Sequence, residues 1–293
     1  MTIRKTYQLF EDEDRILVYE DILNSNGQIV SYRDLQSPNS MEGISDYDQN
    51  GRLIVEKEMI DGKEGSRTEY HYDEEGNVIK RSLFVADELF EEIVIEYLSS
   101  GMVRKVYHYG EEVERMAETA NGDKFVREFF EASVLVERHT GMFDQNTSKE
   151  SVEITDENNQ LVAIRESYYD HDNNILKYEE KNSTGLLLVM SEYQYRNGEV
   201  IFEKHEDHNE GKYYQVDYEY DMNNNLVSQE VRSSSGKLLE YQKMAYDDQN
   251  RLIQEYGYSL GSFNSIYGTY AQGNKYFFEH EYMDQSVLKE MEA

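Results

Sequence analysis

The chain has no cysteine, no tryptophan and a single proline, Pro38, among its 293 residues. The lack of cysteine excludes disulfide frameworks, thiolate metal sites and cysteine nucleophiles. No run approaches the roughly 18 apolar residues of a membrane-spanning helix, and residues 1–15 lack an apolar stretch of signal-peptide length. From these absences we expect a cytoplasmic protein that needs no oxidising compartment.

Basic residues are also scarce. The chain has 29 Lys and Arg against 60 Asp and Glu, which gives a formal net charge of −31, and the acidic excess is spread along the sequence. A field of this sign repels nucleic acid and anionic lipid and attracts basic surfaces. We therefore expect a basic protein partner, no nucleic acid and no membrane. The other interpretation of the charge is that it only keeps an acidic surface soluble.

Tyrosine, by contrast, is abundant, and it marks an internal repeat. The eight-residue frame Tyr-Asp-x-x-Gly/Asn-x-Leu/Val-Ile/Val begins at Tyr47, Tyr72, Tyr220 and Tyr246. An Asp at the second place can accept hydrogen bonds from the amides ahead of it, and Gly or Asn at the fifth tolerates positive φ. The frame therefore predicts a turn between two strands, with these structural turn residues: Asp48, Gly51, Asp73, Gly76, Asp221, Asn224, Asp247 and Asn250.

The spacing of the turns predicts the fold. Clear turn signals recur about every 25 residues in the N-terminal part, which suits one hairpin, and about every 13 residues after Asn159. Tyrosine alternates with polar residues between the turns, the pattern of a half-buried antiparallel strand. We predict an all-β fold, a repetitive antiparallel β-hairpin meander that forms a long twisted or rolled sheet, as a monomer or an edge-paired dimer. Residues 283–292 are compatible with a short C-terminal helix.

The frame resembles the YD repeats of Rhs and teneurin-type proteins over most of residues 20–255. The run 195–200, Tyr-Arg-Asn-Gly-Glu-Val, is also similar to the Tyr-x-Asn-Gly-x-Leu unit of MORN-like bacterial antitoxin proteins. Both resemblances imply β-scaffold binding proteins and not enzymes. The chain departs from the YD family because it shows no toxin domain and no autoproteolytic motif.

One motif matches the formula of a catalytic nucleophile. The run 257–261, Gly-Tyr-Ser-Leu-Gly, would place Ser259 at the elbow of a hydrolase, which also needs an acid and then a histidine downstream. His280 is the only later histidine, and Glu279 stands beside it. The required partners would thus occupy adjacent positions, so we expect no catalytic residue here.

Two further motifs carry metal-ligand residue types. The run 170–174 has the alternating oxygen ligands of a calcium loop, but place twelve, where a bidentate Glu is needed, is Lys181. His205 and His208 would point to opposite faces of a strand. We interpret the first run as a turn of the repeat and the second as a solvated loop, and we expect no metal and no cofactor.

The segment 256–278 breaks both the repeat and the composition, with one charge in 23 residues. We divide the chain into a repeat array at 1–255 and this uncharged cap with its tail at 256–293, both within one structural domain. Tyr, Gly and Ser together are typical of adaptable recognition loops, although the segment would also serve as a cap or plug of the sheet. The partner-binding candidates are Tyr258, Phe263, Tyr267, Tyr270, Tyr276 and Phe277.

The leading functional hypothesis is an immunity protein or antitoxin that binds and neutralises a basic bacterial toxin or effector domain. It rests on the net charge, the lack of a catalytic constellation and the repeat resemblance. The alternative is a structural or cell-surface YD-repeat protein that acts as a spacer, adhesin or glycan binder.

Overall fold

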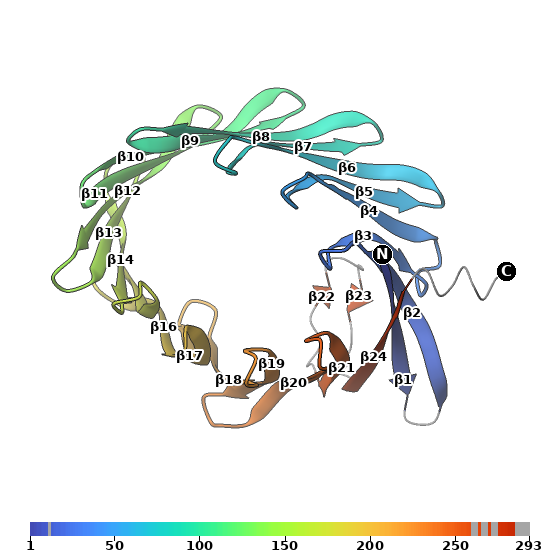
Figure 1. Cartoon of the computed structure of the whole chain (residues 1–293). Coiled ribbons are helices and arrows are strands. Elements are labelled where there is room, and N and C mark those ends of the chain that lie inside the picture. The colour runs from blue at the N-terminus through green and yellow to red at the C-terminus, as the bar shows by residue number, and fades with distance from the viewer. Residues whose placement is uncertain (11–12, 259–262, 265–268, 271–274, 285–293) are drawn as a thin grey trace. The chain divides into compact units, whose positions relative to one another are not determined.

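The computed structural model describes residues 1–10, 13–258, 263–264, 269–270 and 275–284, and all regular elements in these residues are β-strands (Figure 1). The strands follow one another as antiparallel hairpins, so the predicted all-β antiparallel meander is confirmed. The expected C-terminal helix is wrong where the structure describes it, because Met283 and Asp284 end strand β24. The rest of that prediction lies outside the described residues.

The chain divides into two compact units. The first comprises Met1–Ala117, Glu131–Ser133 and the described residues from Phe278 onward, and the second comprises Glu118–Phe130 and Val134–Phe277. This division does not follow the boundary at residue 255 that the sequence suggested. Three strands, β10 (Glu111–Asn121), β11 (Lys124–Glu131) and β24 (Lys275–Asp284), contribute residues to both units.

The first unit contains β1 to β9. Their bounds are β1 Thr2–Phe10, β2 Glu13–Leu23, β3 Ile29–Asp34, β4 Met41–Tyr47, β5 Leu53–Ile60, β6 Lys63–Tyr72, β7 Val78–Val85, β8 Glu88–Leu98 and β9 Gly101–His108. Each strand pairs with the next along the chain. Strand β1 also pairs with β24, with Thr2 opposite Asp284 and Gln8 opposite Phe278. The first strand of the chain is therefore hydrogen-bonded on both sides.

The second unit contains β12 to β23. Their bounds are β12 Val134–Asp144, β13 Lys149–Asp156, β14 Leu161–Tyr169, β15 Ile175–Asn182, β16 Leu187–Arg196, β17 Glu199–Asp207, β18 Lys212–Tyr220, β19 Leu226–Ser233, β20 Leu238–Tyr246, β21 Leu252–Tyr258, β22 Phe263–Asn264 and β23 Thr269–Tyr270. Strands β12 to β21 pair in chain order, and β22 pairs with β23.

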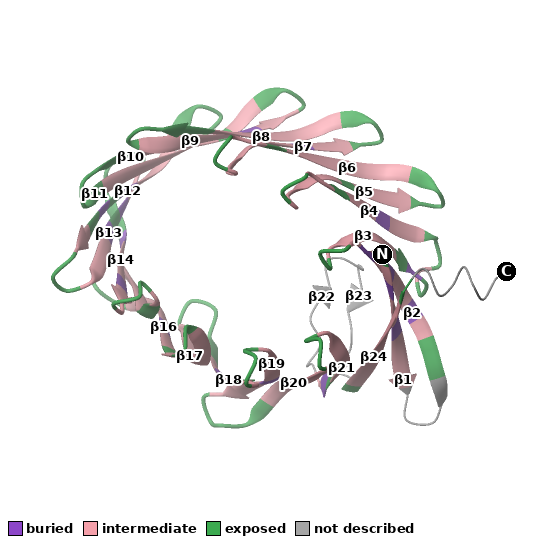
Figure 2. Cartoon of the chain, viewed as in Figure 1, coloured by how far each residue is buried: buried purple, intermediate pink, exposed green. Residues whose placement is uncertain are grey.

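In the described residues, extended strand contacts join hairpin neighbours and the pair β1 and β24, and few side chains are fully buried, so we describe the sheet of each unit as a single layer. Most strand residues are accordingly half-buried and the turns are exposed (Figure 2). The chain exposes 18654 Å², whereas a compact monomer of 34.6 kDa would expose about 13,000 Å². Among the described residues, the buried apolar side chains are Ile3, Val18, Leu23, Val106, Val152, Ile154, Ala163 and Val216, and of these Val18 is fully covered.

The turn frame works through the carboxylate of its Asp. The Asp48 Oδ1 atom accepts hydrogen bonds from the backbone N–H groups of Asn50 (2.8 Å) and Arg52 (2.9 Å), and Oδ2 accepts one from Arg52 Nε at 2.7 Å. Gly51 takes a φ of +78° and donates its N–H to the Asp48 carbonyl. The carboxylate thus joins the Asp at the start of the turn to the residues two and four places ahead. This is why Asp and a residue that tolerates positive φ recur together in the frame.

The tyrosine of the frame connects one hairpin to the preceding one. The Tyr72 hydroxyl donates to the Leu53 carbonyl at 2.7 Å, and Leu53 is the seventh residue of the preceding frame. The same bond runs from Tyr246 to Leu226 at 3.0 Å and from Tyr195 to Ile175 at 2.9 Å. These phenols satisfy carbonyl groups at the start of a strand, so the frame joins successive hairpins as well as turning the chain.

Two aromatic rings lie over glycines on the neighbouring strand. A Cβ atom at Gly141 would collide with the ring of Phe125, and one at Gly43 would collide with the ring of Tyr32. Phe125 also packs against the small cluster of Val152, Ile154 and Ala163. Glycine at these places lets a ring cover the backbone of a sheet that has no second layer.

We expect Tyr72→Phe to lower the free energy of unfolding by about 1 kcal/mol, because the Leu53 carbonyl loses its donor. Denaturant unfolding measures the change, with Tyr70→Phe in the same strand β6 as the matched control. Equal decreases in the free energy of unfolding for the two variants would contradict a stabilising contribution from the hydrogen bond between Tyr72 and Leu53.

We expect Gly141→Ala to destabilise the fold by about 1–3 kcal/mol, since the added methyl group must displace the Phe125 ring. Combining it with Phe125→Leu should cost less than the sum of the two single changes, because the smaller side chain leaves room for the methyl. Thermal unfolding of the three variants tests this, and strict additivity would contradict the contact.

Candidate binding surface

The structure places all eight predicted turn residues in hairpin turns, where the Asp carboxylates bond within their own turn and the Asn250 side chain accepts hydrogen bonds from Asn223 and Asn225 of the preceding frame. The carboxylates of Asp73 and Asp221 accept backbone N–H groups two and four residues ahead, and each also accepts an Asn side chain, Asn77 or Asn225. These hydrogen bonds, first of all those from the Asn side chains, lower the pKa of both carboxyls. The repeated Asp residues therefore shape the sheet and do not face a ligand.

The predicted partner-binding aromatics lie in several places. Tyr258 ends β21 opposite Tyr241, and Phe277 in β24 meets the ring of Tyr256 edge-on at 6.1 Å. Tyr276 covers the backbone of Gly257, and burial raises the pKa of its hydroxyl to about 12. Tyr276 therefore packs on the sheet and is half-buried.

Two further members of that set belong to the short hairpin β22–β23. Phe263 and Tyr270 are paired backbone positions in it. Tyr267 lies outside the described residues, as does Ser259, the nucleophile candidate.

The histidine and carboxylate candidates make contacts within the sheet. His205 Nδ1 lies 3.0 Å from the Ser191 hydroxyl, and its ring stacks on Tyr214 at 4.9 Å. Ser191 is only 5% exposed, so a substrate cannot reach this pair. In the run 170–174, the carboxylate oxygens of Asp170 accept three hydrogen bonds of their own turn. Asp170, His171 and Asp172 lie close together, but this exposed acidic group serves the turn.

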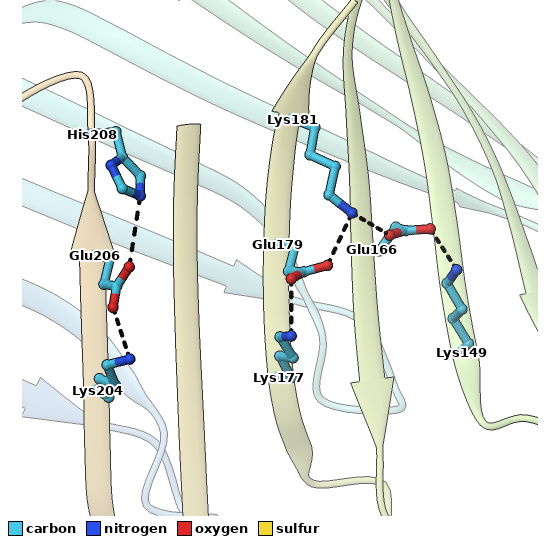
Figure 3. Close-up of polar contacts among 8 residues, drawn as sticks. All are labelled: Lys149, Glu166, Lys177, Glu179, Lys181, Lys204, Glu206 and His208. Carbon is cyan, nitrogen blue, oxygen red and sulfur yellow. Dashed lines mark hydrogen bonds and ion pairs between the residues drawn. The ribbon is translucent and has the colours of Figure 1, made fainter. Parts of the chain in front are cut away.

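Charged side chains on or next to strands β13, β14, β15 and β17 form two groups of ion pairs that the sequence analysis did not find. We name the two groups together the charged ladder: Lys149, Glu166, Lys177, Glu179 and Lys181 form the first, and Lys204, Glu206 and His208 form the second (Figure 3). Glu166 and Glu179 stand directly opposite each other on neighbouring strands, where like charges repel. Lys181 Nζ resolves this repulsion because it lies 3.1 Å from a carboxylate oxygen of each.

The rest of the ladder extends this pattern in both directions. Lys149 binds the second oxygen of Glu166, and Lys177 binds Glu179 at 2.9 Å. Glu192 stands opposite both Lys177 and Lys204 in the strand register, so it continues the alternation of charge. Lys204 then binds Glu206 at 2.7 Å.

The charged groups of the ladder shift one another's pKa values, and each shift favours the charged form. Hydrogen bonds from lysine, first of all Lys149 and Lys177, lower the pKa values of Glu166 and Glu179. The same contacts raise the pKa of Lys181, with the bond to Glu166 as the largest cause. Because each charge has an opposite neighbour, the ladder stabilises the sheet.

The described residues of the second unit also contain an apolar hollow of about 460 Å³. Val126, Met142 and Ile164 contribute to its lining, and Lys124 and Glu153 stand among them. It is a shallow part of the sheet surface, and we assign it no ligand.

Comparisons with known proteins give no family. No family model and no curated protein matches the sequence. Among solved structures, a porin-like protein from Bacteroides uniformis ATCC 8492 is 10% identical over 96% of both chains, with a TM-score of 0.34. A protein of unknown function from Bacteroides fragilis NCTC 9343 is 13% identical over 48% of this chain and 91% of that chain, with a TM-score of 0.17. Scores this low support no functional argument, and the YD-repeat resemblance stays a prediction.

The expected cytoplasmic location needs correction, because the reasoning behind it does not stand. That expectation rested on the lack of long apolar runs, an argument that tests only for helical spans and apolar leaders. The described residues contain no helix that is long and apolar enough to span a membrane. We therefore withdraw the assignment to the cytoplasm.

We expect Glu166→Gln to lower the melting temperature modestly at neutral pH, since the half-buried ladder loses the carboxylate that binds Lys149 and Lys181. A carboxyl whose pKa is lowered by folding adds stability above its unfolded pKa and loses it as pH falls through its folded pKa. The difference from the unmodified chain should therefore vanish as pH falls below 4.5, the ordinary pKa of glutamate. Glu219→Gln, an exposed position in β18, is the control. A difference in melting temperature that does not change with pH would contradict the stabilising role of the charged ladder.

Proposed function

We propose that this protein is a non-enzymatic scaffold that binds a basic protein partner, and that it acts as an inhibitor of a basic toxin or effector domain. The observation that carries the proposal is the distribution of charge. Most lysine and arginine side chains form ion pairs inside the sheet, as Arg4 does with Asp21 at 2.7 Å and Arg165 with Glu180 at 2.7 Å. With 60 acids against 29 bases, the unpaired remainder is acidic.

The sheet architecture supports the same proposal. A single-layer sheet has two accessible faces and two rows of turns, and this chain exposes 18654 Å² of surface. Stable protein complexes bury about 800 Å² on each partner. The scaffold therefore has ample area for a partner of moderate size without any rearrangement of its strands.

Electrostatics favours a basic partner over other macromolecules. A net charge of −31 repels nucleic acid and anionic lipid. For a cationic partner it speeds the encounter and makes the association rate fall with ionic strength. These properties suit an inhibitor that must capture its target quickly.

An affinity pull-down with this chain as bait tests the proposal, and it should recover a basic protein at low salt that high salt releases. An unrelated protein of similar negative charge is the control bait, because a partner that binds both recognises charge alone. Recovery of no basic protein would contradict the proposal. Recovery of glycans or envelope proteins would instead favour a spacer, adhesin or glycan-binding role.

A further inference from the structure

Exposed apolar side chains form a row along one end of the strands in the first unit. Leu35, Ile60, Val85 and Tyr109 are 44%, 39%, 45% and 71% exposed. They follow or end β3, β5, β7 and β9, one in each of four successive hairpins. Since neighbouring strands run in opposite directions, turns that follow alternate strands emerge at the same end of the sheet. We name these four residues the rim row.

The opposite end of the same strands has a different character. Its turns at 24–28, 48–52 and 73–77 contain only polar residues and glycine, and in each turn two side chains hydrogen-bond to each other. Tyr97 and Leu98, in the next hairpin, are exposed at that end. The regular apolar series is thus a property of one end of the sheet, where a patch of this kind marks an interaction site.

The turns of the rim row are also conformationally costly. Tyr109 has a φ of +50° and Ala86, next to Val85, has a φ of +51°. Asn or Gly normally occupies such positions, and a bulky side chain there is strained. The Tyr109 ring nevertheless stays 71% exposed, in edge contact with Phe90 at 5.3 Å. An exposed tyrosine in a strained turn is more consistent with binding than with stability.

Acidic residues surround the row. Asp61, Glu88 and Glu111 are exposed in the same turns, and Lys63, opposite Ile60, is an exposed base among them. Asp87 is also there, with a side chain that is 86% exposed and 3.7 Å from Arg67. A partner that covers the apolar side chains therefore meets negative charge on its flanks.

The spacing of the row sets the geometry of its partner. Successive members are two strands apart, so they repeat at about 9.6 Å. Seven residues of an α-helix advance about 10.5 Å, and the row of four spans about 29 Å, the length of a helix of about 20 residues. We propose that the rim row binds an amphipathic helix of the basic partner, with apolar side chains every seventh residue and Lys or Arg beside them.

This inference rests on the proposed function, because it assigns the basic partner to one surface. A second copy of this chain would offer the same repeat but would bring another charge of −31 to an acidic rim. An anionic lipid surface meets the same repulsion. The basic helix is the occupant that satisfies both the apolar spacing and the charge.

The test uses the full-length chain and two fluorescent 21-residue Leu/Lys peptides of identical composition, one with leucines in a heptad pattern and one scrambled. We expect the heptad peptide to bind more tightly and to gain helicity on binding. The variant Ile60→Thr/Val85→Thr/Tyr109→Asn should weaken its binding at least tenfold, and Leu98→Thr at the opposite end should leave it unchanged. Tyr109→Asn alone should raise the melting temperature, because Asn tolerates the positive φ, while it weakens binding.

The outcomes separate this inference from the proposed function. Equal binding of the two peptides, or equal binding by the triple variant, would overturn the rim row and leave the basic-partner proposal standing. Failure of both peptides to bind would also overturn the rim row. The basic-partner proposal falls in addition only if the pull-down recovers no basic protein.

Discussion

Each sheet of this protein is a single layer, so a side chain gains burial only from its neighbours on adjacent strands. Hydrophobic burial alone is then weak, and few apolar side chains are fully covered. Cross-strand contacts replace a core. Tyrosine suits this setting because its ring covers neighbouring backbone and its hydroxyl still reaches a carbonyl, as Tyr72 does with Leu53. The abundance of tyrosine follows from this constraint.

The same constraint determines the electrostatic surface. Lysine and arginine are used as cross-strand ties, and in the charged ladder Lys181 holds together two opposed glutamates. Each of these basic groups neutralises the acid with which it is paired. The acids in excess of the bases are not neutralised in this way, so the electrostatic potential outside the protein is negative. A basic partner would thus meet the negative charge of the 60 acids, which 29 bases do not balance.

The local chemistry of the repeat could be predicted from the sequence, because Asp48 and Gly51 act within one turn. The charged ladder could not, since bulges near the turns shift the strand register, as between Glu180 and Lys181, and decide which charges face each other. The hydrogen bond from the Tyr72 hydroxyl could not be predicted either, because its acceptor, the Leu53 carbonyl, lies 19 residues earlier in the chain. The cytoplasmic location failed because apolar runs report only on helical spans and leaders. Of the predicted binding aromatics, Tyr267 falls outside the described residues.

The central functional claim is electrostatic capture of a basic partner by an acidic scaffold. The most direct test is the association rate constant with the captured partner, measured by stopped-flow fluorescence across a range of ionic strength. The account predicts that the association rate falls steeply as salt rises, while the dissociation rate changes little. An association rate that is insensitive to salt would contradict it.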